Sequence, residues 1–360
     1  MKIYLFGQRN ILGGGTHFSG FCDALKSMSV YGEMVCEVAA SGKKVVPIVH
    51  QIQPEDVSIL FFPTISEQFI KGTIIKWAIF ETDVLPESYI DYLNRSHLIW
   101  VPSSWAKVIL QNHGIASAKV HIVHEGVDPA MFHPFARQAQ HEDDVFRFYM
   151  CGKNEARKGF DELLKGFRLA FNNDPKVTLC LKADHFWGTS DQIEAKQQAL
   201  IQQIEHLGVT NIVPIFKKLS VQDMALINTH CDAFVFPSRA EGWGLPLIEA
   251  IACGLPAVST YHSGHTEYLS AMDDKFVRLS HQLHPIECPE FIGHWGEGGS
   301  WAVATPEEIA RGLLSMKEDC QGYKAKALLA SDIIRRDFSW LRAAEQAVAS
   351  LTKMNFLVSI

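Results

Sequence analysis

Short runs of apolar residues alternate with turns and with stretches of helical spacing along the whole chain. Runs of this kind suit strands that are buried on both faces, and their alternation with helices predicts parallel, doubly wound α/β sheets. The predicted strands lie at 2–6, 44–49, 59–62, 74–80, 98–101, 120–123, 146–150, 177–182, 212–216 and 234–237. The clearest helical patterns lie at 18–30, 191–208, 245–253, 306–316, 323–335 and 340–353.

A polar stretch at 136–144 interrupts this alternation and is the clearest linker by composition. The chain has 360 residues, enough for two domains with a core each. The predicted domains are therefore 1–140 and 145–338.

Composition and charge exclude several classes of protein. A net charge of −7 without a basic stripe argues against nucleic-acid binding. No apolar run approaches the length of a membrane span, and Met1–Gly7 has the pattern of a strand, not of a signal peptide, so a cytoplasmic protein without a stable membrane anchor is expected. The eight cysteines are widely spaced and mostly lie in apolar runs, which predicts buried free thiols.

The stretch 234–260 carries the strongest candidate chemistry. An apolar run ends at Pro237, a glycine-containing loop follows, and Pro246 marks the start of a helix. The free amides of that helix point into the loop as an anion site, with Glu241 before the helix and Glu249 inside it. Carboxylates accept hydrogen bonds from hydroxyls and amides hold phosphate oxygens, so a sugar nucleotide suits this loop.

A basic turn lies between the predicted strand at 146–150 and the helix that starts near Phe160. Lys153, Arg157 and Lys158 stand at this junction, where the helix dipole adds to their charge and favours a phosphate. The alternative is an ordinary solvated basic turn.

Two further segments follow predicted strands in the first half. Gly13-Gly14-Gly15 precedes a helix but lacks dinucleotide-fingerprint spacing, because Phe18 stands where the last glycine would fall. Glu81 and Asp83 follow an apolar strand, the place where open parallel sheets keep ligand residues. A plain tight turn at the glycines, and a helix-capping Thr82 or Asp83 beside a solvated Glu81, remain as alternatives.

These segments together resemble the family-4 retaining glycosyltransferases. The resemblance rests on Pro237-Ser238, Glu241-Gly242, Gly244-Leu245-Pro246, Glu249-Ala250 and Gly254-x-Pro256, with the basic turn, the Glu81 segment and Phe338-Ser339-Trp340 in the family's order. It implies the B-type glycosyltransferase fold, in which two Rossmann-like domains face each other across a cleft. It also implies that the last helix, at 340–360, returns to the N-terminal domain.

The implied reaction transfers a sugar from a nucleotide diphosphate to an acceptor with retention of anomeric configuration. In the family the basic turn holds the diphosphate, although Lys153 stands where an arginine is usual, which leaves bidentate contact to Arg157. Glu249 would take the ribose hydroxyls and Glu241 a sugar hydroxyl. The implied catalytic residues are Lys158, Glu241, Lys153 and Glu81; the implied donor-binding residues are Glu249, Gly242, Trp243, Gly244, Leu245, Arg157, Gly14, Gly15, Lys218 and Leu219.

The resemblance implies no metal in the cleft and a UDP- or GDP-sugar as co-substrate, with the acceptor unidentified. His281, His284, Cys288 and His294 lie close in sequence but match no zinc spacing. Three alternatives remain: a nucleotide-sugar epimerase of the same fold, a nicotinamide-dependent oxidoreductase, which the spacing of the glycines disfavours, and a non-catalytic sugar-binding protein.

Overall fold

The computed structural model describes residues 1–10, 13–28, 31–39, 48–61, 67, 70–134, 144–184, 189–296 and 298–356. The chain forms two compact units. The first consists of Met1–Asp128 and Asp337–Ile360, and the second of Pro129–Arg336. Apart from Asp144, the polar stretch at 136–144 lies outside the described residues.

The first unit contains a six-stranded sheet in the order β2-β1-β3-β4-β5-β6. All of its strand pairs are parallel, as the buried apolar runs predicted. The strands are β1 Ile3–Gly7, β2 Val35–Ala39, β3 Val57–Leu60, β4 Thr73–Trp77, β5 Leu98–Val101 and β6 Val120–Ile122. The helices of this unit are α1 Gly13–Ser27, α3 Glu87–Asn94, α4 Ser104–Asn112 and the C-terminal α13 Trp340–Lys353.

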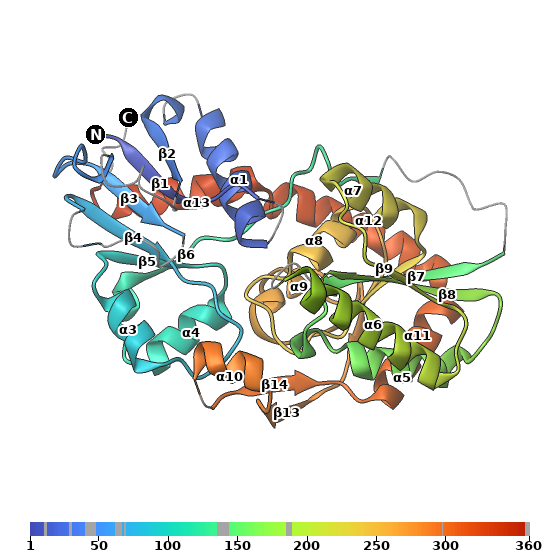
Figure 1. The fold of residues 1–360 in the computed structure, drawn as a ribbon. Coiled ribbons are helices and arrows are strands. Elements are labelled where there is room, and N and C mark those ends of the chain that lie inside the picture. The colour runs from blue at the N-terminus through green and yellow to red at the C-terminus, as the bar shows by residue number, and fades with distance from the viewer. Residues whose placement is uncertain are drawn as a thin grey trace. The chain divides into compact units, whose positions relative to one another are not determined.

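The C-terminal segment packs within this first unit. Val127 donates its N–H to the Phe338 carbonyl at 3.0 Å, and Trp340 donates to the Val127 carbonyl at 3.2 Å. Helix α13 then runs beside α1 (Figure 1). Gly20 of α1 makes this close approach possible, because a Cβ at that position would lie 2.3 Å from the Trp340 ring.

We therefore expect Gly20→Ala to destabilise the first unit. The added methyl must displace a large, nearly buried ring, and overpacking of this kind costs about 1–3 kcal/mol, which outweighs the gain of about 1 kcal/mol from replacing glycine inside a helix. Gly13→Ala is the matched control in the same helix, because a Cβ there meets nothing within 4 Å. Thermal unfolding of the two variants and wild type measures the difference. If the unfolding midpoint of Gly20→Ala is at or above that of Gly13→Ala, the close packing of α1 on the Trp340 ring is contradicted.

The second unit contains another six-stranded parallel sheet, in the order β12-β11-β10-β7-β8-β9. Its strands are β7 Phe146–Lys153, β8 Val177–Asp184, β9 Ile212–Ile215, β10 Ala233–Phe236, β11 Ala257–Thr260 and β12 Val277–Leu279. Its helices are α5 Phe160–Phe171, α6 Ser190–Leu207, α7 Val221–His230, α8 Leu245–Ala252, α9 Thr266–Leu269, α10 Pro289–Trp295, α11 Pro306–Glu318 and α12 Cys320–Asp337. Two such sheets are the α/β architecture expected from the sequence.

The two faces of this second sheet have different partners. Phe148 and Met150 of β7 and Leu179 and Leu181 of β8 pack with α5, α6 and α11 in one core. Because side chains alternate along a strand, Tyr149 and its ring partner Phe234 face the opposite side. Helix α8 packs against β10 and β11 and, being well clear of α5 and α11, covers that other side (Figure 1).

Three differences from the sequence predictions concern strand β2 and the segments 44–49 and 281–300. Strand β2 was not predicted, because its partly exposed residues include Glu37 and form no continuous apolar run. The predicted strand at 44–49 lies outside the described residues except for Ile48 and Val49, which are helical. No element was predicted in the segment 281–300, which holds an antiparallel hairpin, β13 Gln282–Pro285 with β14 Ser300–Val303, and helix α10.

Two further observations concern the described part of the chain. No helix there is both long and apolar enough to cross a membrane. All eight cysteines are free thiols: Cys22, Cys151, Cys231 and Cys253 are buried, and the other four are half-buried.

Candidate active site

The loop that follows β10 forms the centre of the candidate site, at the carboxyl edge of the second sheet. Gly244 precedes helix α8 in a left-handed conformation, with φ 91° and ψ 53°, which glycine adopts without strain. Pro246 lies in the first turn, where its missing N–H removes no helical hydrogen bond. The amides at the start of α8 therefore open toward the loop as predicted.

The basic turn lies against this loop. After β7 the chain forms a short 3₁₀ turn at Ala156–Lys158 and reaches Gly159, whose φ of 70° is again left-handed. A Cβ on Gly159 would lie 2.4 Å from the Pro237 carbonyl oxygen, so glycine allows the two loops to meet. Arg239 donates its N–H to the Arg157 carbonyl at 2.8 Å, which joins them further.

The contact between the loops brings the two cations onto one carboxylate. Lys158 Nζ donates to Glu241 Oε1 at 2.5 Å, and Arg157 Nη1 lies 3.1 Å from the same oxygen. Ser238 Oγ also donates to Glu241 Oε1. Arg157, Lys158 and Glu241 are all nearly inaccessible to solvent, at 7%, 5% and 5% exposure. The solvated basic turn is thus excluded for Arg157 and Lys158.

Charge interactions decide the state of this cluster. Burial by itself raises the pKa of Glu241, but Lys158 and Arg157 outweigh it and bring that pKa down to about 2. Burial lowers the pKa of Lys158, and Glu241 opposes this by favouring the ammonium. Two buried cations therefore share one buried carboxylate, and the group of three has an excess of positive charge.

Glu249 is in a different environment. Its half-buried side chain belongs to α8. A negative charge on Glu249 raises the pKa values of Tyr149 and Cys151 on the adjoining sheet face. Burial raises the pKa of Glu249 to about 8. The two glutamates of the motif thus differ in charge at neutral pH: Glu241 is ionised and Glu249 is mostly protonated.

The remaining predicted residues of the second unit lie around this centre. Lys153, at the end of β7, is half-buried, and its Nζ lies 3.8 Å from Glu155 Oε1, while the other Glu155 oxygen lies 3.5 Å from Arg157. Trp243 is buried, with its ring against Tyr268 at 5.2 Å, so it supports the loop from inside. Tyr268 donates its hydroxyl to the Gly244 carbonyl at 3.1 Å.

Lys218 and Leu219 lie in the loop between β9 and α7. Lys218 is exposed and Leu219 is half-buried. The loop ends at Ser220, which caps α7 in a reciprocal pair of hydrogen bonds with Asp223.

Gly14, Gly15 and Glu81 belong to the first unit. The glycines form the first turn of α1, which starts at Gly13, so the loop expected at 13–15 is wrong. A Cβ on Gly15 would lie 2.2 Å from Asn10 Oδ1, which explains the need for glycine in that turn.

Glu81 is half-buried and follows β4. Burial, Tyr92 and Glu81 together raise the pKa of Tyr89, so Glu81 lies near α3. Thr82 Oγ1 accepts from the Val84 N–H at 3.3 Å in a local turn, and α3 begins only after Pro86 without a side-chain cap. The helix-capping alternative for Thr82 and Asp83 is therefore wrong.

Two serines were missed as site residues by the sequence reading. Ser238 contacts the Glu241 carboxylate, and Ser263 accepts a hydrogen bond from the Glu241 N–H at 2.8 Å. The position of Ser238 directly after a strand end was an available signal. Ser263 gave none, because its contact with Glu241 crosses between loops that are 22 residues apart in sequence.

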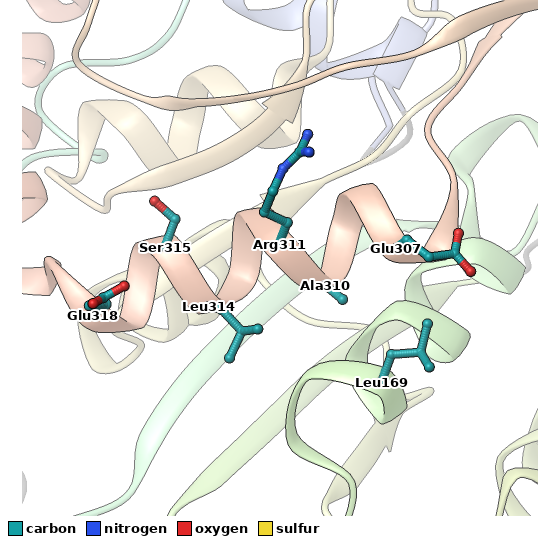
Figure 2. A pocket seen from close by; sticks show the side chains of 7 residues that line it. All are labelled: Leu169, Glu307, Ala310, Arg311, Leu314, Ser315 and Glu318. Atoms are coloured by element: carbon teal, nitrogen blue, oxygen red, sulfur yellow. The ribbon is translucent and has the colours of Figure 1, made fainter.

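Two other features of the described residues lie apart from the site. No three His, Cys, Asp or Glu side chains there are grouped so as to hold a metal ion. A hollow of about 450 Å³ lies between α5 and α11, with Leu169 and Leu314 on the two helices and Glu307 and Glu318 toward the ends of α11 (Figure 2). None of the predicted site residues lines it, and nothing in the structure shows what would cover it.

Residues 133–281 match the family model described as "Glycosyl transferases group 1". A mannosylfructose-phosphate synthase of Agrobacterium fabrum is 26% identical over 233 residues, 59% of this chain and 50% of that protein. A D-inositol 3-phosphate glycosyltransferase of Catenulispora acidiphila is 29% identical over 164 residues, 44% of this chain and 39% of that protein. The chain thus spans half or less of the length of these relatives.

Solved structures show the same fold over the whole chain. A sucrose-phosphate synthase from Thermosynechococcus elongatus superposes with a TM-score of 0.73 at 14% identity and covers 100% of both chains. Anabaena HepE in complex with UDP-glucose superposes with a TM-score of 0.72 at 15% identity, over 98% of this chain and 100% of that one. The segment 133–281, which holds Lys158, Glu241 and Glu249, therefore matches the family model of the glycosyl transferases group 1, and the chain as a whole has the GT-B fold.

Proposed function

We propose that this protein is a retaining glycosyltransferase that moves a sugar from a nucleotide diphosphate to an acceptor. The observation that carries the proposal is the buried pair of cations, Arg157 and Lys158, held on Glu241 beside the start of α8. A buried cluster with excess positive charge next to free helix amides favours an anion with several oxygens. The nucleotide diphosphate of a sugar donor is such an anion.

In the proposed reaction the bond between the anomeric carbon and the diphosphate oxygen breaks, and a bond to the acceptor oxygen forms on the same face of the sugar. The acceptor's proton passes to the departing phosphate. Negative charge grows on the diphosphate as it leaves, and preorganised cations and amides in a site that excludes water stabilise it strongly. Lys158, Arg157 and the amides of Gly242–Leu245 supply that stabilisation, with Lys153 at the edge.

Glu241 has two tasks in this proposal. Its Oε1 accepts from Lys158 and Ser238 and lies next to Arg157, so it orients both cations. Among the described residues none hydrogen-bonds its Oε2, and we assign that oxygen to a hydroxyl of the donor sugar. Glu249 takes the ribose hydroxyls, and Lys218 and Leu219 adjoin the base.

The acceptor belongs to the first unit in this proposal, with Glu81 as the residue that orients it. The donor is a UDP- or GDP-sugar; the UDP-glucose complex of HepE supports the former. No metal takes part in the proposed reaction, so turnover is measured with a chelator present.

A panel of nucleotide sugars and free nucleotides tests the function. A donor that binds only the folded state raises the melting temperature. At a concentration of a hundred times its dissociation constant it adds about 2.7 kcal/mol to the free energy of unfolding. The donor that shifts melting most is then incubated without acceptor, and the products are identified by NMR. Slow hydrolysis to a free sugar with the same anomeric configuration as the donor supports a retaining transferase. An isomerised sugar nucleotide indicates an epimerase.

Donor binding should depend on pH through Glu249. Its raised pKa means that the free protein holds a proton there at neutral pH, and two ribose hydroxyls prefer the carboxylate. Donor affinity is therefore expected to rise with pH up to about 8 and to level off above it, with proton release on binding below about 8. Calorimetry in buffers of different ionisation enthalpy measures that release.

Glu249→Gln is the matched variant, because it keeps the shape and removes the titration. We expect weaker donor binding that no longer varies with pH in this range, and no proton release. The raised pKa also means that wild type loses stability as pH rises from 4.5 through about 8, so the unliganded variant should be the more stable protein above that range. Proton release that persists in Glu249→Gln would refute the assignment.

A further inference from the structure

The turn that follows β11 is built around a residue in an unfavourable conformation. Ser263 has φ 59°, and the other described non-glycine residues with positive φ are Asn172, Asp273 and Asn355. Asparagine and aspartate tolerate the left-handed region, but serine is seldom found there. Ser263 is also almost fully buried, with 1% exposure. Strain of this kind persists only where surrounding contacts require it.

The contacts of this turn hold both backbone polar groups of Glu241. The Glu241 N–H donates to Ser263 Oγ at 2.8 Å, and the Gly264 N–H donates to the Glu241 carbonyl at 2.8 Å. Ser263 Oγ donates onward to the His262 carbonyl at 2.7 Å, so its own proton is engaged and its lone pair faces Glu241. The turn also fits closely against the loop, because a Cβ on Gly264 would lie 1.9 Å from the Gly242 carbonyl oxygen.

We infer that Ser263 is a positioning residue, which holds the Glu241 backbone so that its carboxylate meets both Lys158 and Arg157. The inference rests on the proposed function for its effect on turnover. The left-handed backbone at Ser263 directs the hydroxyl toward the Glu241 amide. The strained conformation thereby keeps the hydrogen bond between Ser263 and Glu241 in place. Displacement of Glu241 moves both cations, since its Oε1 receives Lys158 at 2.5 Å and Arg157 at 3.1 Å.

Two substitutions separate this role from ordinary packing. Ser263→Gly removes the hydroxyl and also relieves the strained backbone, whereas Ser263→Ala removes the hydroxyl and keeps the strain. We expect the melting temperature of Ser263→Gly to lie within about 2 °C of that of wild type. The melting temperature of Ser263→Ala should be several degrees lower than that of wild type. A positioning role predicts that kcat falls similarly in both, about 10- to 100-fold, because displacement of a catalytic group by 1 Å has effects of that size. The KM for the donor should change much less than kcat, since Glu249 and the helix amides, which hold the donor in the ground state, are untouched.

Ser259→Ala is the control for loss of a buried hydroxyl in the same region. Ser259 is fully buried in β11 and donates to the Thr260 carbonyl at 2.8 Å and to the Phe236 carbonyl at 3.3 Å, and not to Glu241. Its kcat should stay within about twofold of wild type. If activity follows stability, so that Ser263→Gly turns over donor like wild type, Ser263 has only a structural role and the inference is overturned.

Hydrogen exchange at the Glu241 amide gives a readout that does not require the proposed function. We expect faster exchange at this amide in both Ser263 variants and no change in Ser259→Ala. If wild type turns over no nucleotide sugar, the proposed function fails, while faster exchange still supports the hold of Ser263 on Glu241. Unchanged exchange in both Ser263 variants overturns the inference whether or not the enzyme is active.

Discussion

Lys158→Met is expected to lower kcat for the best donor by about 10²- to 10³-fold, the effect of removing one preorganised group that stabilises a developing anion. Lys158 is 5% exposed and its Nζ lies 2.5 Å from Glu241 Oε1, so methionine fills a similar volume without the charge. Arg157 remains 3.1 Å from the same oxygen and keeps the carboxylate compensated. The melting temperature of Lys158→Met should therefore fall only slightly, although its kcat falls steeply.

Lys165→Met is the control for Lys158→Met. Lys165 is exposed on α5, in the helix that follows the basic turn, and its replacement removes one charge from the same unit. Its kcat should match wild type. Release of nucleoside diphosphate, followed in a coupled assay with chelator present, measures both variants. If Lys158→Met keeps its kcat within threefold of wild type, the leaving group does not depend on Lys158.

The sequence allowed the two halves of the site to be predicted separately. Apolar runs that end in a glycine-containing loop locate the end of β10 and the start of α8, and the charges after β7 indicate the basic turn. Their meeting was not derivable from spacing, because Lys158 and Glu241 are 83 residues apart. The order of strands puts β7 next to β10, and only that pairing brings the two loops together.

The environments of the two glutamates show a second limit. Glu241 and Glu249 have the same side chain in one short segment, yet their pKa values move in opposite directions, to about 2 and about 8. The difference comes from Arg157 and Lys158, which reach one carboxylate and not the other. Spacing along the chain does not contain that information.

The remaining differences have local causes. Glycines predicted a loop at 13–15, but α1 starts at Gly13 despite their weak helix propensity, and the close approach of Asn10 accounts for glycine at position 15. The hairpin of β13 and β14 was missed because β13 is exposed throughout and lacks an apolar face. Ser263 acts through its backbone conformation, which its residue type gives no reason to expect.

Glu241→Gln is expected to lose about 3–5 kcal/mol of stability, because it leaves Lys158 and Arg157 buried without their carboxylate. The pKa of Glu241 is depressed, so the stabilisation by its charge is present above pH 4.5 and is lost as pH falls toward about 2. The gap in melting temperature between wild type and Glu241→Gln should therefore narrow across that interval. Turnover should also be lost, since both cations lose their orientation.

The double variant Lys158→Met/Glu241→Gln tests whether charge is the cause. Removing one cation together with the carboxylate leaves Arg157 as the cation of the cluster, so the double variant should melt above Glu241→Gln while remaining inactive. Inorganic phosphate should raise the melting temperature of Glu241→Gln more than that of the double variant, because the former keeps Lys158 as well as Arg157 for the anion to bind. Recovery of stability without recovery of activity would assign stability to the charge balance of the cluster and turnover to the intact pair of Lys158 and Glu241. Equal melting temperatures of Glu241→Gln and the double variant would instead attribute the loss of stability to altered packing at residue 241.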